Sequence, residues 1–124
     1  ILIVDDEIHN VRTFSAILNQ DGYKTFTALN GQEGLDVLTN ENIDLVLLDI
    51  KMEKIDGLEV LKEIKKYDRN MKVIMVTVAS DDETRQKAQE LGADDFIRKP
   101  LNKAYLEGTV SLKVSQLSKE RKNK

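Results

Sequence analysis

The 124-residue chain contains no cysteine, a single proline and a single histidine, and none of its apolar runs is long. The absence of cysteine excludes disulfide bonds, thiolate metal sites and cysteine nucleophiles, and it is compatible with a reducing compartment. No apolar stretch approaches the roughly 20 residues that span a bilayer, and no secretory signal pattern opens the chain. We therefore expect a cytoplasmic protein that makes no contact with a membrane.

Charge is plentiful but balanced, because 33% of the residues are charged and the net charge is only -3. So small a net charge selects no class of partner, and we find no nucleic-acid-binding motif, so we expect this domain to bind no nucleic acid itself. The length is that of one domain with one core. We predict a domain over residues 1–118 and interpret the basic residues 119–124 as a tail or the start of a linker.

Short apolar runs rich in β-branched residues recur along the chain. They occupy residues 1–4, 45–48 and 73–76, and two weaker candidates occupy residues 23–28 and 95–98. Runs without polar alternation are typical of strands that are buried on both faces. The sequence therefore predicts five strands.

Helices are predicted between the strands, because apolar residues recur there at spacings of three and four. Two such stripes are Val11, Phe14, Ile17 and Leu18, and Leu58, Leu61 and Ile64. Asn30 with Glu33 resembles a capping box, and Gly22 and Gly92 lie where helices are expected to end. Strands that alternate with helices through right-handed crossovers form a parallel sheet with helices on both faces, so we predict a doubly wound α/β fold.

Polar residues follow four of the five predicted strands. They are Asp5, Asp6 and Glu7 after the first strand, Asp49 after the third, Thr77 after the fourth, and Lys99 and Pro100 after the fifth. The carboxyl ends of parallel strands meet at one edge, where ligands of such folds bind. Clustered carboxylates repel one another unless a cation joins them, and hard oxygen ligands suit Mg²⁺. We therefore expect a Mg²⁺ site in which Asp49 is a nucleophile toward phosphorus.

Four segments, VDDE, LLDIKMEKIDG, VIMVT and FIRKP, resemble in this order the receiver domains of response regulators, the CheY-like family of two-component signal transduction. The resemblance extends from residue 1 to about residue 117. It implies a flavodoxin-like sheet with strand order 2-1-3-4-5. It also implies a phosphoprotein that catalyses only its own phosphorylation and dephosphorylation and is otherwise not an enzyme.

The resemblance assigns a role to each strand-end residue. It makes Asp49 the phosphoacceptor and Lys99 the partner of the phosphoryl oxygens. The implied Mg²⁺ ligands are Asp5, Asp6, Asp49 and the backbone carbonyl of Lys51. Thr77 and Phe96 are the implied switch pair. It further implies a cis peptide bond before Pro100. The implied partners are a sensor histidine kinase and, through the fourth helix, fifth strand and fifth helix, a second copy of the domain.

Three residues depart from the common pattern of the family: Lys51, Glu53 and Val78. The branched Val78 side chain is expected to narrow access to Asp49 and to slow phosphorylation by small donors. The fourth helix, predicted at about residues 81–91, has few large apolar residues, so we expect it to be weakly anchored. We assign no role to His9, and we interpret Asp56 and Gly57 as the turn that starts the third helix.

Two other functions compete with a phosphorylated switch. The first is a Mg²⁺-dependent phosphatase or phosphotransferase with an aspartyl nucleophile, which needs an acid-base residue two positions after the nucleophile. Lys51 stands there instead, and the chain contains no segment for a substrate cap. The second is a receiver-like scaffold that is never phosphorylated, although the chain keeps all of Asp6, Asp49, Thr77 and Lys99.

Overall fold

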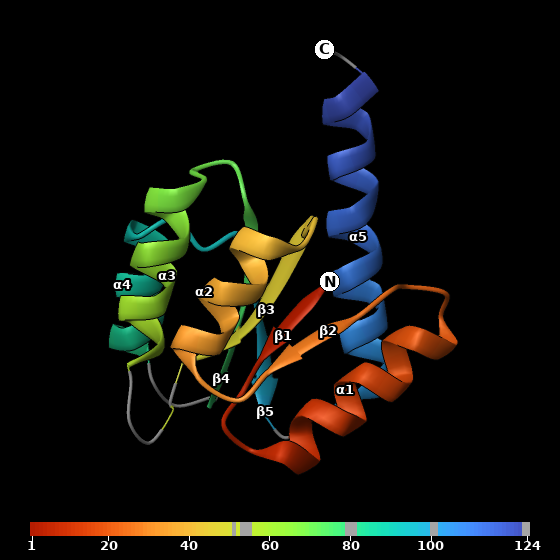
Figure 1. Cartoon of the computed structure of the whole chain (residues 1–124), viewed down its shortest axis with the longest axis horizontal. Coiled ribbons are helices and arrows are strands. Elements are labelled where there is room, and N and C mark those ends of the chain that lie inside the picture. Colours follow the sequence, from red (N-terminus) through yellow and green to blue (C-terminus); the bar gives the residue numbers. More distant parts are fainter. Residues whose placement is uncertain (51, 53–55, 79–81, 100–101, 123–124) are drawn as a thin grey trace.

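The computed structural model describes residues 1–50, 52, 56–78, 82–99 and 102–122. Strands and helices alternate along the chain (Figure 1): β1 (Leu2–Val4), α1 (Ile8–Gln20), β2 (Phe26–Ala28), α2 (Gly31–Asn40), β3 (Leu45–Asp49), α3 (Gly57–Tyr67), β4 (Lys72–Val78), α4 (Asp82–Glu90), β5 (Asp95–Lys99) and α5 (Lys103–Lys122). The five strands are parallel and are ordered β2-β1-β3-β4-β5. The predicted fold class and strand order are confirmed.

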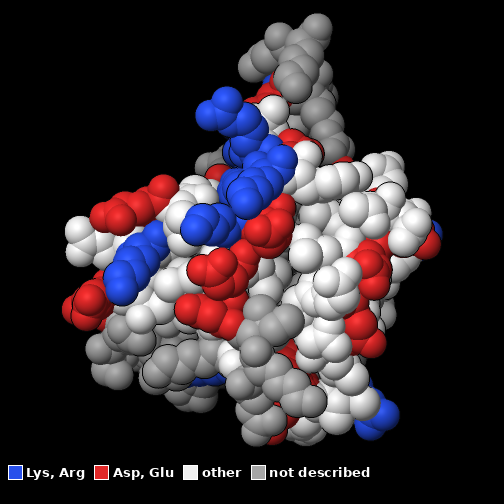
Figure 2. All heavy atoms as spheres, turned by 60° about the vertical axis from the view of Figure 1, so that its left-hand side comes forward, with Lys and Arg blue, Asp and Glu red and all other residues white. Residues whose placement is uncertain are grey.

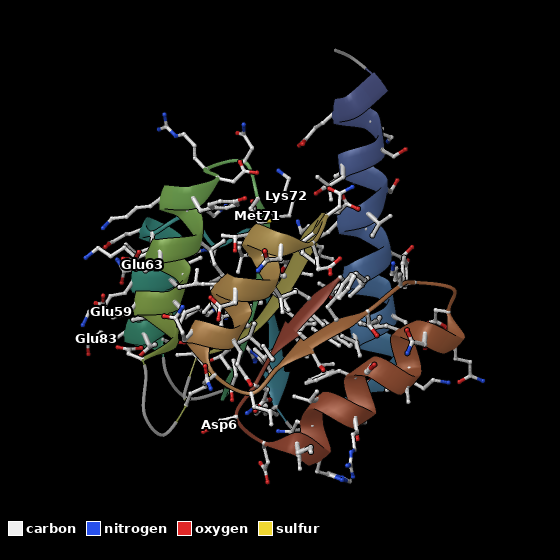
Figure 3. All side chains as sticks on the ribbon, in the orientation of Figure 1. Asp6, Glu59, Glu63, Met71, Lys72 and Glu83 are labelled. Carbon is white, nitrogen blue, oxygen red and sulfur yellow. The ribbon has the colours of Figure 1, made fainter. Side chains whose placement is uncertain are left out.

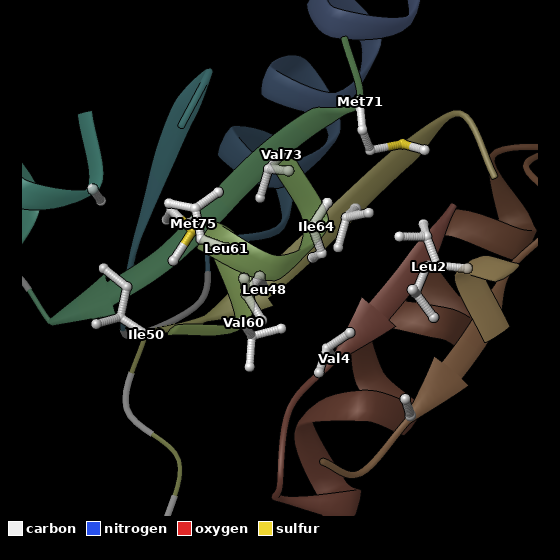
Figure 4. Close-up of a cluster of buried hydrophobic side chains, with 14 of the residues drawn as sticks. Leu2, Val4, Leu48, Ile50, Val60, Leu61, Ile64, Met71, Val73 and Met75 are labelled. Atoms are coloured by element: carbon white, nitrogen blue, oxygen red, sulfur yellow. The ribbon is translucent and has the colours of Figure 1, made fainter. Parts of the chain in front are cut away.

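The helices cover the sheet in two layers, with α1 and α5 on one face and α2, α3 and α4 on the other (Figure 1). Each layer has its own apolar core, because successive side chains of a strand point to opposite faces of the sheet. Leu48 and Met75 pack against Leu61 and Ile64 of α3 on one side (Figure 4). Both faces of the central strands are therefore buried, as their unbroken apolar runs indicate.

Two strands differ from the predicted length by three residues, and each of the other three differs by one. The second strand is shorter, because the N–H of Tyr23 bonds the carbonyl of Leu18 at 3.0 Å and so still belongs to the end of α1. The fourth strand is longer, since pairing with β3 on one side and β5 on the other extends it from Lys72 to Val78. Both differences come from backbone pairing, which side-chain patterns do not report.

The predicted helix ends are present. The Asn30 side chain accepts a hydrogen bond from the Glu33 N–H at 2.8 Å, while Glu33 Oε2 accepts one from the Leu29 N–H at 2.7 Å. Gly22 and Gly92 have φ of 95° and 102°, the left-handed conformation that favours glycine after a helix. These turns direct the chain back into β2 and β5.

Gly108 lies inside α5 on its exposed side, where an added Cβ would meet no atom within 4 Å. Glycine in an exposed helix interior loses more backbone entropy on folding than alanine does, so Gly108→Ala should stabilise the domain by about 0.5–1 kcal/mol. Urea unfolding followed by circular dichroism measures this change. Ser111→Gly, at another exposed position of α5, is the matched control and should lower the stability; a destabilised Gly108→Ala variant would contradict the prediction.

Asp94 joins three elements at the end of the sheet opposite the strand-end carboxylates. Its Oδ2 accepts hydrogen bonds from Lys65 Nζ at 3.2 Å and from the Val73 N–H at 2.9 Å. Lys72 Nζ lies 3.9 Å from Asp94 Oδ1 and 3.1 Å from Glu120 of α5. One carboxylate therefore connects α3, β4 and, through Lys72, the last turns of α5.

Asp94→Ala should destabilise the domain by about 1–3 kcal/mol, because it leaves the Val73 N–H without its acceptor and the largely buried Lys65 ammonium without its counter-charge, with the Met71 carbonyl at 2.6 Å as its remaining acceptor. Glu120→Gln removes only the exposed end of the same set of ion pairs and should cost about 0–1 kcal/mol. Chemical denaturation of both variants measures the difference. Equal losses of stability would show that Asp94 acts only as one more surface charge.

The face formed by α3 and α4 carries charges of both signs. Figure 2 shows basic side chains gathered in the upper part of this face, with acidic side chains beside and below them. Lys66 and Glu63 form one of its exposed ion pairs, at 3.5 Å. Such pairs contribute little stability.

Among the described residues, no helix is both long enough and apolar enough to cross a bilayer.

Candidate functional site

Three carboxylates come together where β1 and β3 end. Asp5 and Asp6 follow β1, Asp49 is the last residue of the neighbouring β3, and one carboxylate oxygen of each lies within 4.8 Å of the other two. Asp5 and Asp49 are buried, with 1% and 3% of their surface exposed, whereas Asp6 is exposed. In Figure 3 Asp6 lies at the lower edge of the sheet, and Met71 and Lys72 lie at the opposite edge. The predicted carboxylate cluster is therefore present.

Asp5 is held in place by the start of α1. Its Oδ1 accepts a hydrogen bond from the Glu7 N–H at 3.0 Å, and its Oδ2 accepts one from Asn10 Nδ2 at 3.3 Å. Asn10 was not predicted as part of the site, because an asparagine on the first turn of a helix is ordinarily a solvated residue. Its position three residues into α1 carries it back toward the carboxylate.

Lys99 supplies a cation to this cluster from two strands away. Its Nζ donates to Asp49 Oδ2 at 3.1 Å, and the lysine side chain is 31% exposed while the aspartate side chain is 4% exposed. Among the residues that the structure describes, these three carboxylates lie beside one ammonium, and all the atoms that the carboxylates offer to a metal are hard oxygens. This donor set fits a divalent cation such as Mg²⁺.

Thr77 and Phe96 lie on the same face of the sheet, on the neighbouring strands β4 and β5. Met75 and Phe96 are register partners, and both belong to the core under α3 and α4. Thr77 follows Met75 by two residues, so the alternation of a strand brings it to that same face. Both residues are buried, each with 6% of its surface exposed. The Thr77 hydroxyl group therefore lies toward the carboxylate edge of the sheet, and the Phe96 ring lies two residues farther from that edge on the neighbouring strand.

Gly57 lies directly behind Asp49. A Cβ at this position would be 2.3 Å from the Asp49 carbonyl oxygen and 2.6 Å from Ile50 Cα, and the Gly57 N–H bonds the Ile50 carbonyl at 2.8 Å. Asp56 caps α3 through a 3.0 Å hydrogen bond to the Leu58 N–H. Sequence reasoning predicted the turn but missed this close approach, because it depends on two segments packed backbone to backbone.

Several predicted features lie outside the described residues: Lys51 with its carbonyl, Glu53, Pro100 with the peptide bond before it, and the side chain of Val78. The expectations for them remain predictions. His9 is exposed near the start of α1.

The fold and this site define a class of protein. The family model of the response regulator receiver domain matches residues 1–111, and the chain belongs to that family, the receiver domains of two-component signalling. Receiver domains are signalling modules, and an acidic triad such as Asp5, Asp6 and Asp49 is typical of their Mg²⁺ sites.

Individual relatives agree with this assignment. The chain is 42% identical over 102 residues to sporulation initiation phosphotransferase F of Bacillus subtilis, covering 82% of each chain. It is 45% identical over 102 residues to the transcriptional regulatory protein CpxR homolog of Haemophilus influenzae, but spans only 44% of that protein. Its structure superposes on a CheY-like receiver domain protein of Methanospirillum hungatei with a TM-score of 0.90, at 35% identity and with 96% and 95% of the two chains covered.

Proposed function

We propose that this chain is a phosphoacceptor switch, in which Asp49 takes a phosphoryl group from the phosphohistidine of a sensor kinase. One observation carries the proposal: the buried Asp49 ends β3 beside two further carboxylates, with the Lys99 ammonium at 3.1 Å. A receiver domain implies a cognate histidine kinase. Since histidine kinases draw on ATP, the proposal places the protein in the cytoplasm.

In this reaction a carboxylate oxygen of Asp49 attacks phosphorus. The new oxygen–phosphorus bond forms as the nitrogen–phosphorus bond of the donor breaks, and the imidazole leaves with its electron pair. Such transfers depend on positioning and on neutralising the charge of the phosphoryl oxygens. The rigid end of β3 orients the carboxylate, and the Lys99 ammonium pairs with a phosphoryl oxygen after transfer.

Asp5, Asp6 and Asp49 would hold the Mg²⁺, with the Lys51 carbonyl as a further ligand that the family resemblance implies. When bound, the ion offsets the charge of the carboxylates and of the phosphoryl group. The hydrogen bonds from Glu7 and Asn10 to Asp5 keep that carboxylate oriented toward the cluster.

The output is a change at the face formed by α4, β5 and α5. The Thr77 hydroxyl turns to the phosphoryl group, and the Phe96 ring fills the space that it leaves. Tyr105 and Leu112 are about half exposed, lie two turns apart on α5, and Tyr105 donates a hydrogen bond to the Phe96 carbonyl at 3.4 Å. This exposed apolar surface supports the proposal that a second copy of the domain binds there.

Beryllofluoride, which mimics a phosphoryl group on aspartate, separates this function from the two alternatives. We expect fluorine NMR to show stoichiometric binding that requires Mg²⁺. Asp49→Asn should abolish this binding. Asp44→Asn, which lies just before the opposite end of β3, should leave it intact. Sedimentation of the same samples reports whether binding favours a dimer. Turnover of a small phosphate ester would instead support the phosphatase, and no binding by the wild type would support the scaffold.

A further inference from the structure

The guanidinium of Arg85 lies over the ring of Phe96, with Cζ 5.0 Å from the ring centroid. Arg85 belongs to α4 and Phe96 to β5. A guanidinium within about 6 Å of an aromatic centroid is attracted by the negative face of the ring, and more strongly where water is excluded. The ring here is 6% exposed and Arg85 is half-buried, so the pair is largely shielded from solvent.

This contact matters because α4 has few others with the sheet. Ala88 is the one residue described as buried in α4, and the helix has no large apolar side chain. In the part of the chain that the structure describes, no carboxylate forms an ion pair with Arg85. Among the described residues the Phe96 ring is therefore the partner of the guanidinium, and the pair connects α4 to β5.

We propose that Arg85 is a positioning residue that favours the buried Phe96 ring and thereby links the ring to the position of α4. An outward movement of the ring must either break the contact with the guanidinium or draw α4 along. The ring and the helix then change together, as a two-state element requires. For its regulatory meaning this inference rests on the proposed function, in which a buried ring accompanies a phosphoryl group on Asp49.

The contact itself is tested without any phosphoryl group, by amide hydrogen exchange of α4. Arg85→Met keeps a long side chain over the ring but removes the charge, and it should speed exchange in α4 by about two- to fivefold. Arg85→Lys should restore part of the protection. Lys87→Met is the matched control, because Lys87 is an exposed cation of the same helix that pairs with Glu83 at 3.8 Å. It should leave the exchange rates of the central amides of α4 unchanged.

A double-mutant cycle assigns the effect to the ring. In a Phe96→Leu background Arg85→Met should change exchange no further, because the partner of the guanidinium is already absent. The same increase in both backgrounds, or no increase in either, would overturn the proposed contact.

The link to the site is tested by the affinity for beryllofluoride with Mg²⁺. Arg85 favours the buried ring, and in the proposed function the buried ring accompanies the phosphoryl group, so the guanidinium should also favour binding of the phosphoryl mimic. Arg85→Met should therefore weaken beryllofluoride binding by about the same two- to fivefold. If the wild type binds beryllofluoride and Arg85→Met binds it with the same affinity, this inference is overturned and the proposed function stands. Absence of binding by the wild type would overturn both.

Discussion

Lys99→Met should lower the rate of Asp49 phosphorylation by acetyl phosphate by about a hundredfold, the usual cost of removing one charged or polar donor from developing negative charge. Methionine keeps much of the lysine stem but removes the ammonium that lies 3.1 Å from Asp49 Oδ2. The same change leaves the three carboxylates more negative, so Mg²⁺ should bind more tightly. Single-turnover phosphorylation and Mg²⁺ titration by NMR measure the two effects.

Opposite signs for the two effects distinguish a lost cation from a damaged fold, which would weaken both. Lys113→Met is the matched control, because Lys113 also pairs with an aspartate, Asp95 at 3.4 Å, but away from the carboxylate cluster. This variant should phosphorylate at the wild-type rate. A Lys99→Met variant that phosphorylates as fast as the wild type would remove Lys99 from the account.

Gly57→Ala should destabilise the domain by about 1–3 kcal/mol or more and should also weaken beryllofluoride binding. The added Cβ would lie 2.3 Å from the Asp49 carbonyl oxygen and 2.6 Å from Ile50 Cα, and backbone atoms cannot turn aside as a flexible side chain can. Relief of this overlap must move either the start of α3 or the end of β3. Urea unfolding and fluorine NMR of beryllofluoride follow the two consequences.

The same substitution at Gly108 is the control, since the space around that position is open and the expected change has the opposite sign. The contrast tests whether the close approach, and not the loss of glycine as such, is responsible. Wild-type stability in Gly57→Ala would show that the end of β3 tolerates displacement.

Much of the fold was predictable because the pattern of three of the five strands is unambiguous. Runs such as residues 45–48 lack polar alternation, and strands buried on both faces require helices above and below the sheet. The strand predicted at residues 23–28 was one of two weaker candidates, and only its three residues Phe26–Ala28 pair with β1. Its length depends on where the hydrogen bonds at the end of α1 stop, which is at Tyr23 and is set by backbone geometry.

The site was predictable as far as strand ends determine it. Asp5, Asp6, Asp49 and Lys99 each follow or end a strand, and parallel strands bring such residues to one edge. Asn10, Arg85 and the close approach of Gly57 to Asp49 were missed, because each depends on a contact between elements that no local pattern reports. Asparagine on a helix, glycine at a helix start and arginine on an exposed helix have ordinary roles in most sequences.

The central claim is that Asp49 carries the phosphoryl group, and mapping the modified residue tests it most directly. The domain is incubated with acetyl phosphate and Mg²⁺, and its peptides are analysed by mass spectrometry, with hydroxylamine to cleave acyl phosphates. We predict one hydroxylamine-labile phosphoryl group, located on Asp49 and absent from Asp49→Asn. A phosphoryl group on another residue, or none under conditions in which the folded wild type binds Mg²⁺, would contradict the account.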